Sequence, residues 1–131
     1  MPDLKEALTI FFERFNAAVT VWNLQLTVIL GLIAFLAVAS SVMQNKLLRG
    51  GLIVGYLMLA IANLLTLEKI EAQRRTLAEF VVSRLKGSDL AAMASTVGAP
   101  SPMAVALLHL AADIIAVLAI WFIPSVSRHP H

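Results

Sequence analysis

The chain has 131 residues, of which 60% are hydrophobic and 14% are charged, and its formal net charge is +2. Its mean hydropathy is +0.86, whereas soluble domains are roughly half apolar and one quarter charged. A soluble protein this apolar would lack the polar residues needed to cover its surface, so we expect a lipid bilayer around it. The absence of cysteine excludes disulfides and thiolate metal sites. The few basic residues form no stripe of the kind that binds nucleic acid.

Residues 1–19 have the pattern of an amphipathic helix. Asp3 and Glu6 form an acidic variant of a capping box at its start. A helix with an aromatic stripe beside a membrane span typically lies in the headgroup plane. We therefore predict an interfacial helix that anchors the first span, and recruitment of a protein partner is the alternative. The apolar face repeats at intervals of three and four residues and comprises Leu4, Leu8, Phe11, Phe12, Phe15 and Val19.

Three later segments are apolar enough to cross a bilayer, and we place them at residues 20–43, 50–67 and 103–123. Residues 44–49 separate the first two as a short turn. Ser101 is a good N-cap for the third span, because Pro102 then occupies the first helical position. Pro124 is expected to end that span.

The second helix is predicted to continue beyond the membrane to residue 86, because residues 68–86 contain no proline or glycine. Glu71 and Arg75 support it as a favourable pair four residues apart. Residues 88–101 are expected to form a loop or a short helix. The predicted fold is thus a single all-α integral membrane domain, with three transmembrane helices, an interfacial amphipathic N-terminal helix and a long second helix that extends beyond the membrane.

Gly51 and Gly55 form a GxxxG motif at the start of the second span. This spacing lets another helix approach the backbone closely. We expect that neighbour to be the protein's own first or third helix. The motif is short and common, so it is weak evidence for self-association, which is the alternative.

A seam of polar residues is predicted inside the membrane. Asp113 lies near the middle of the third span, and His109 is one turn away on the same face. Tyr56 and Asn63 are seven residues apart on the antiparallel second span and so share a face at matching depths. Thr27 on the first span reaches a similar level. An ionisable group at this depth normally faces protein or a water-filled cavity, so we expect Asp113 to face the second helix.

Two interpretations of this seam follow from the residue types. The groups could hydrogen-bond to one another and set helix register, with about 0.6 kcal/mol per bond. Alternatively, the carboxyl and the imidazole could bind a proton or a ligand. No P-loop, Rossmann glycine pattern, HExxH or GxSxG occurs in the sequence. We therefore expect no enzyme activity, no cofactor and no metal.

The distribution of Lys and Arg predicts the topology. Three spans place residues 1–19 and 68–101 on one side, with seven of the ten basic residues, and residues 44–49 and the C-terminal tail on the other, with three. The positive-inside rule then makes the N-terminus cytoplasmic. The general shape resembles that of small multi-pass proteins of bacterial inner membranes. The leading hypothesis is a non-enzymatic accessory subunit, scaffold or self-associating component, as a homo-oligomer or in a larger membrane complex. The alternative is a transport or proton-sensing element that uses Asp113 and His109.

Overall fold

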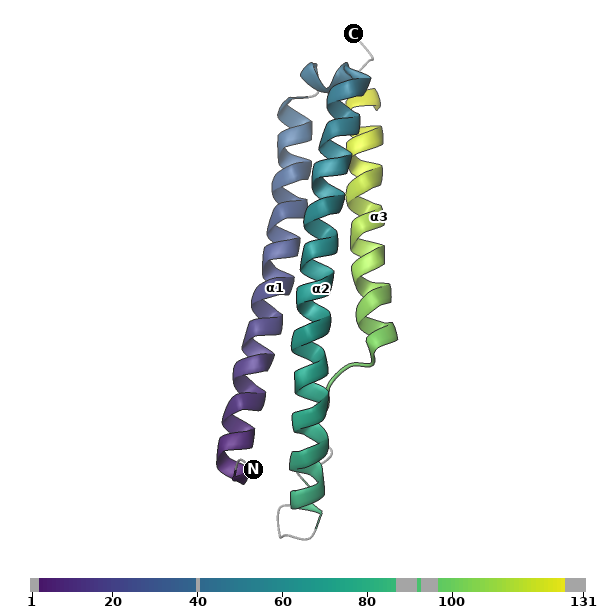
Figure 1. The fold of residues 1–131 in the computed structure, drawn as a ribbon. Helices are drawn as coiled ribbons and strands as arrows, with labels where there is room; N and C mark the ends of the chain where they lie inside the picture. Colours follow the sequence, from purple (N-terminus) through teal and green to yellow (C-terminus); the bar gives the residue numbers. More distant parts are fainter. Residues whose placement is uncertain (1–2, 40, 87–91, 93–96, 127–131) are drawn as a thin grey trace. The chain divides into compact units, whose positions relative to one another are not determined.

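A computed structural model describes residues 3–39, 41–86, 92 and 97–126. They form three α-helices, α1 (Leu4–Val38), α2 (Lys46–Leu85) and α3 (Pro102–Val126), and a short 3-10 helix, η1 (Val42–Gln44) (Figure 1). Each α-helix contains a segment that is long and apolar enough to cross a membrane. The described part of the chain is therefore an all-α helical bundle with three candidate spans, which indicates a multi-pass membrane protein.

Polar side chains cap the start of each α-helix. The carboxylate of Asp3 accepts a hydrogen bond from the Glu6 amide at 2.7 Å, and Asn45 Oδ1 accepts one from the Leu47 amide at 2.9 Å. The hydroxyl of Ser101 accepts from the Ala104 amide at 3.2 Å. Each cap satisfies one of the amides that a helix leaves unpaired in its first turn. The predicted start of α3 at Ser101 and Pro102 is thus present in the structure.

Several helix boundaries differ from the predicted ones. α1 has no break at Val19, where the sequence suggests that a surface helix gives way to a span, and it ends at Val38 rather than at residue 43. The predicted turn at residues 44–49 is shorter, because Asn45 caps α2 and the helix already begins at Lys46. α3 contains Pro124 in its last turn, where proline removes one helical hydrogen bond without ending the helix.

The long second helix is continuous. α2 passes through Leu67 without interruption and ends at Leu85, and the Lys86 amide still donates to the Val82 carbonyl at 3.1 Å. Its 40 residues correspond to about 60 Å at the α-helical rise. That length is about twice the thickness of the hydrocarbon layer of a bilayer.

The chain divides into two compact units that both helices α1 and α2 enter. Unit 2 consists of Asn23–Leu64 and Ala106–His131. Within it, the last part of α1, the first part of α2 and most of α3 lie side by side (Figure 1). Their buried side chains and Met43 of η1 form one apolar core, which comprises Ile29, Leu36, Met43, Tyr56, Ala60, Ala116 and Ile120.

Unit 1 consists of Met1–Trp22 and Leu65–Val105, so it pairs the first part of α1 with the last part of α2. Ala7 of α1 packs with Val81 and Leu85 of α2, while Ala18 packs with Leu67 and Val105. The N-terminal segment thus contacts the extension of α2. Its aromatic face is only partly covered, because Phe11 is buried whereas Phe12 and Phe15 are exposed.

Some predicted features lie outside the described residues. They are most of residues 88–96, the first part of the segment where a loop or a short helix is expected, and the C-terminal tail from residue 127. Residues 97–101, which precede α3, have no regular secondary structure.

Candidate functional site

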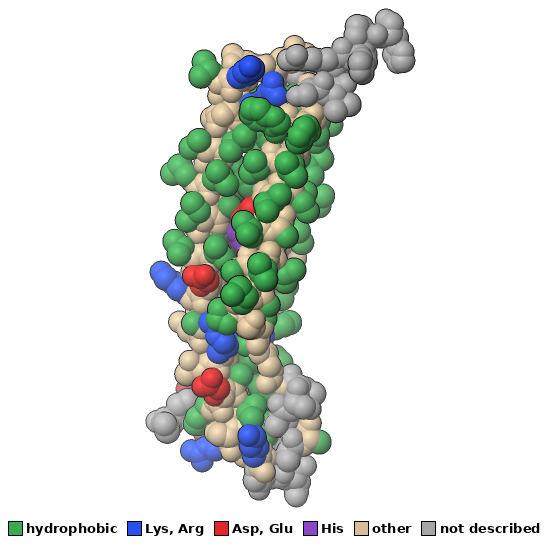
Figure 2. Space-filling view, turned by 90° about the vertical axis from the view of Figure 1, so that its right-hand side faces the viewer, with side chains coloured by type: hydrophobic (Ala, Val, Ile, Leu, Met, Phe, Trp, Pro, Cys, Tyr) green, Lys and Arg blue, Asp and Glu red, His purple; other side chains and the backbone are tan. Residues whose placement is uncertain are grey.

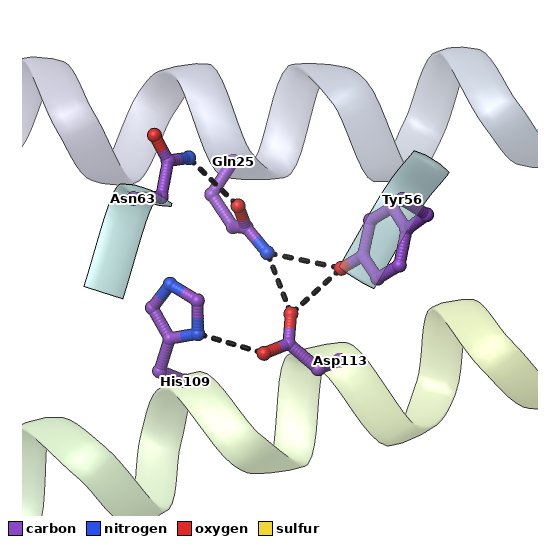
Figure 3. A network of polar contacts seen from close by, with 5 residues as sticks. All are labelled: Gln25, Tyr56, Asn63, His109 and Asp113. Carbon is purple, nitrogen blue, oxygen red and sulfur yellow. Dashed lines mark hydrogen bonds and ion pairs between the residues drawn. The ribbon is translucent and has the colours of Figure 1, made fainter. Parts of the chain in front are cut away.

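Five polar side chains meet inside unit 2, and we call them the polar network: Gln25, Tyr56, Asn63, His109 and Asp113 (Figure 3). Gln25 comes from α1, Tyr56 and Asn63 from α2, and His109 and Asp113 from α3. The network therefore links all three helices of the unit. Hydrogen bonds within a bundle are the usual way to satisfy polar groups that lipid would leave unpaired.

The carboxyl of Asp113 is the centre of the polar network. Its Oδ1 accepts from Gln25 Nε2 at 2.7 Å and from the Tyr56 hydroxyl at 2.8 Å. Its Oδ2 lies 2.8 Å from His109 Nδ1. Because Oδ1 already accepts two hydrogens, a proton bound to this carboxyl belongs on Oδ2, between Asp113 and His109.

The two amides extend the network away from Asp113. Asn63 Nδ2 donates to Gln25 Oε1 at 2.8 Å. Gln25 Nε2 donates one hydrogen to Asp113 and the other to the Tyr56 hydroxyl, which is 2.9 Å away. Hydrogen-bond donation therefore runs in one direction, from Asn63 through Gln25 to Asp113.

Most of the network is closed to its surroundings, and Asp113 is the exception. Gln25 and His109 are each 1% exposed, whereas the side chain of Asp113 is 16% exposed. Asp113 borders an open pocket of about 320 Å³, whose other lining residues are Leu57, Leu110, Ile114, Val117 and Leu118. Figure 2 shows a small area of acidic and histidine atoms between hydrophobic side chains on this face. One edge of the carboxyl thus reaches an apolar surface.

Helix geometry explains why these residues meet. His109 and Asp113 are one turn apart on α3, and Tyr56 and Asn63 are two turns apart on α2. Asp113 is eleven residues from both ends of the candidate span Pro102–Pro124, or about 16 Å from each at the helical rise. If this span crosses a bilayer, the carboxyl lies at its middle.

The structure brings together four of the five residues that the sequence predicted for the seam. Tyr56, Asn63, His109 and Asp113 are in the polar network, but Thr27 is not. Its side chain is exposed and donates to the Asn23 carbonyl of its own helix at 2.7 Å. Gln25 takes its place. Two residues correspond to about 200° around a helix, so Gln25 and Thr27 face nearly opposite sides.

The glycine pair does not pack as predicted. Gly51 and Gly55 are exposed, and a Cβ built on either would have no atom within 4 Å outside its immediate backbone. The expected contact with the first or third helix is therefore absent for these residues. The reason is rotational, since Tyr56 and Ala60 of α2 face the core of unit 2 instead.

A second buried polar group in unit 2 is Arg49. Its guanidinium lies 5.6 Å from the centre of the Trp121 ring and donates to the carbonyls of Trp121 and Gln44 at 3.2 and 3.4 Å. Arg49 thus ties α2 to the last turns of α3. In the part of the chain that the structure describes, no three His, Asp or Glu side chains gather as metal ligands would.

Comparisons with known proteins found no relative. No protein-family model matches the chain, and no curated protein or solved structure is significantly similar to it.

Proposed function

We propose that the chain is a multi-pass membrane protein in which Asp113 and His109 bind and release a proton within the bilayer, as a proton-sensing or transport element. One observation supports this proposal above the others. A single carboxyl at the middle of a candidate span receives hydrogen bonds from α1 and α2 and pairs with an imidazole of α3. Ionisable groups at this depth are costly and are typical of proton and ion pathways.

The charge of the pair explains what the donors can do. With one proton between Asp113 Oδ2 and a singly protonated His109, the pair has either a neutral acid or an ion pair, and its net charge is zero. Release of that proton leaves one negative charge in apolar surroundings. Gln25 and Tyr56 are placed to stabilise this charge, since both donate to Oδ1. Protonation would therefore change hydrogen bonds that hold three helices together.

A purely structural role for the polar network does not require an ionisable group at position 113. An amide at position 113 could accept from Gln25 and Tyr56 and donate to His109, so register alone does not require an acid. The acid adds the ability to gain and lose a proton. One edge of Asp113 is also exposed beside an apolar pocket, whereas the remainder of the polar network is closed.

Infrared difference spectroscopy of the protein in lipid nanodiscs tests the proposal. As the pH is changed, the C=O stretching band of a protonated carboxyl should appear and disappear in the wild type. That band should be missing in Asp113→Asn, which keeps the hydrogen-bonding groups, and present in Glu79→Gln, which removes an exposed acid of unit 1. A titrating band of equal size in Asp113→Asn would overturn the proposal, as would the absence of any such band in the wild type.

A second assay separates transport from sensing. Liposomes that contain the protein and a pH-sensitive dye inside are exposed to a pH jump. Flux above that of empty liposomes, lost in Asp113→Asn, supports transport. A titrating carboxyl without flux supports sensing.

The exposed glycines favour a second candidate function, a self-associating or accessory membrane subunit. Gly51 and Gly55 lie on one face of α2, where nothing in the described chain covers them. Small residues at this spacing permit close helix contact in membranes. Since the chain has no cysteine, Gly55→Cys can be crosslinked cleanly in bilayers. A disulfide dimer that Gly51→Leu abolishes supports this function, whereas equal crosslinking from Leu108→Cys, an exposed site on α3, would indicate random collision.

For orientation we propose an N-terminus in the cytoplasm and a bacterial inner membrane. Seven of the ten Lys and Arg residues lie on the side of the N-terminus if all three candidate spans cross. The length of α2, about 60 Å, supports an extension of this helix outside the hydrocarbon layer. Residues 1–19 could then lie at the interface, in contact with that extension.

A further inference from the structure

We infer that Asn63 is a positioning residue of the proton site, which sets the proton affinity of Asp113 by orienting the amide of Gln25. This inference rests on the proposed function. Asn63 is 8% exposed, and its side chain donates to Gln25 Oε1 at 2.8 Å. Gln25 Nε2 in turn donates to Asp113 and Tyr56, so Asn63 is connected to both through Gln25.

The orientation of Gln25 matters because the two ends of an amide have opposite roles. The nitrogen end donates and the oxygen end accepts. In the structure the nitrogen faces Asp113 Oδ1 at 2.7 Å. The reverse orientation would place an oxygen against Oδ1, and two acceptors repel unless Oδ1 carries the proton. The observed orientation therefore requires an Oδ1 without a proton, whether the carboxyl is ionised or protonated on Oδ2.

Asn63 is the group that occupies the other end of this amide. Its Nδ2 donates to Oε1, so rotation of Gln25 would exchange this bond for a contact between two NH₂ groups. The reversed state needs both amides to turn. The hydrogen bond from Asn63 thereby stabilises the orientation in which Gln25 Nε2 donates to Asp113.

The charges around Asp113 bear on this effect. Among the residues that the structure describes, the titratable groups bonded to Asp113 are Tyr56 from α2 and His109 from α3, and α1 contributes the neutral Gln25. Arg49, the buried cation of unit 2, is bonded to the carbonyls of Trp121 and Gln44 instead. The influence of α1 on the charge of Asp113 therefore depends on the direction of one amide.

The test is the infrared titration of the Asp113 band in nanodiscs, with three variants. Asn63→Leu keeps a branched side chain and removes the donor. It should move the midpoint of deprotonation to higher pH by about one unit, because the ionised carboxyl loses part of a hydrogen bond. Asn63→Ser retains a donor and should move it less. Val81→Ala makes a cavity among the buried residues of unit 1, which contains none of the five network residues, so it should lower stability and leave the midpoint unchanged.

The outcomes separate a positioning role from a structural one. An unchanged midpoint in Asn63→Leu, or an equal shift in Val81→Ala, would overturn the inference while the proposed function stands. If the wild type shows no titrating Asp113 band, the proposed function fails and the inference with it. Should Asn63→Leu not fold, Asn63→Ser decides, because an upward shift smaller than one unit supports the inference and no shift overturns it.

Discussion

At the scale of single residues, the carboxyl of Asp113 determines what the polar network can do. Three groups from three helices contact its two oxygens within 2.8 Å. A buried donor that loses its acceptor costs about 1–3 kcal/mol, although in membranes an average interhelical hydrogen bond contributes only about 0.6 kcal/mol. Loss of a shared residue is therefore expected to cost more than loss of a single bond.

A matched pair of variants can test whether Gln25, and not Thr27, belongs to the polar network. Gln25→Leu removes hydrogen bonds to Asp113, Tyr56 and Asn63 and should lower the free energy of unfolding by about 1–3 kcal/mol. Thr27→Val removes only a bond to the carbonyl of Asn23 in its own helix and should change it by under about 0.5 kcal/mol. Unfolding of both in mixed micelles by a denaturing detergent measures the difference. Equal losses would refute this assignment of the two side chains.

For the residues of the polar network, the level along each span could be predicted from the sequence better than the helix face on which the side chain lies. Counting residues from the span ends placed Tyr56, Asn63, His109 and Asp113 at compatible levels, because helical rise is uniform. Within α3 and within α2, spacing also gave the shared face. The face of α1 was wrong, since a span that is uncharged from Phe15 to Asn45 offers little pattern to set its rotation. Gln25 is the largest polar side chain near that level, and its size was the available signal.

At the scale of helices, Arg74 holds unit 1 together. Its guanidinium lies 5.3 and 5.0 Å from the ring centres of Phe11 and Phe15 and 2.6 Å from Glu71 Oε1. Both charged side chains are buried, with 6% and 4% of their side-chain surface exposed. Arg74 thus joins α2 to α1 through cation–π contacts, while Glu71 balances its charge.

We predict that Arg74→Met destabilises the protein more than the double variant Arg74→Met with Glu71→Gln. The single change leaves a buried carboxylate without its ion pair, which costs about 3–5 kcal/mol in known cases. Arg84→Met is the control, because Arg84 is exposed and lies 5.4 Å from the Phe80 ring. Thermal unfolding in detergent measures all three. A single variant no less stable than the double would contradict this role for Arg74.

The course of α2 could be predicted from the sequence, but its first residue could not. The continuity of α2 follows from the absence of proline and glycine after Leu67. Its start was missed because Gly50 and Gly51 suggest the beginning of the span, although the Asn45 cap, five residues before Gly50, had already begun the helix. Hydropathy locates the apolar layer and not the helix end. The pairing of α1 with α2 in unit 1 could not be predicted, since an amphipathic face suits lipid headgroups and a helix equally well.

At the scale of the whole molecule, orientation in the membrane is the prediction with the widest consequences. Single cysteines at Lys46 and Ser101, both exposed, should lie on opposite sides of the bilayer. With the N-terminus in the cytoplasm, a membrane-impermeant thiol reagent added to intact cells should label Lys46→Cys and spare Ser101→Cys. Labelling should become equal once the membrane is opened. Labelling of Ser101→Cys alone would reverse the orientation, and labelling of both in intact cells would contradict three crossings.

The central claim, a proton between Asp113 and His109, is tested most directly by solid-state nitrogen NMR of the imidazole in bilayers. The chain has three histidines, so His129→Asn and His131→Asn leave ¹⁵N-labelled His109 alone. The account predicts that the Nδ1 resonance changes with pH together with the infrared band of Asp113. It also predicts that Asp113→Asn shifts this resonance and removes its pH dependence over the same range. An Nδ1 resonance that titrates identically with and without the Asp113 carboxyl would contradict the account.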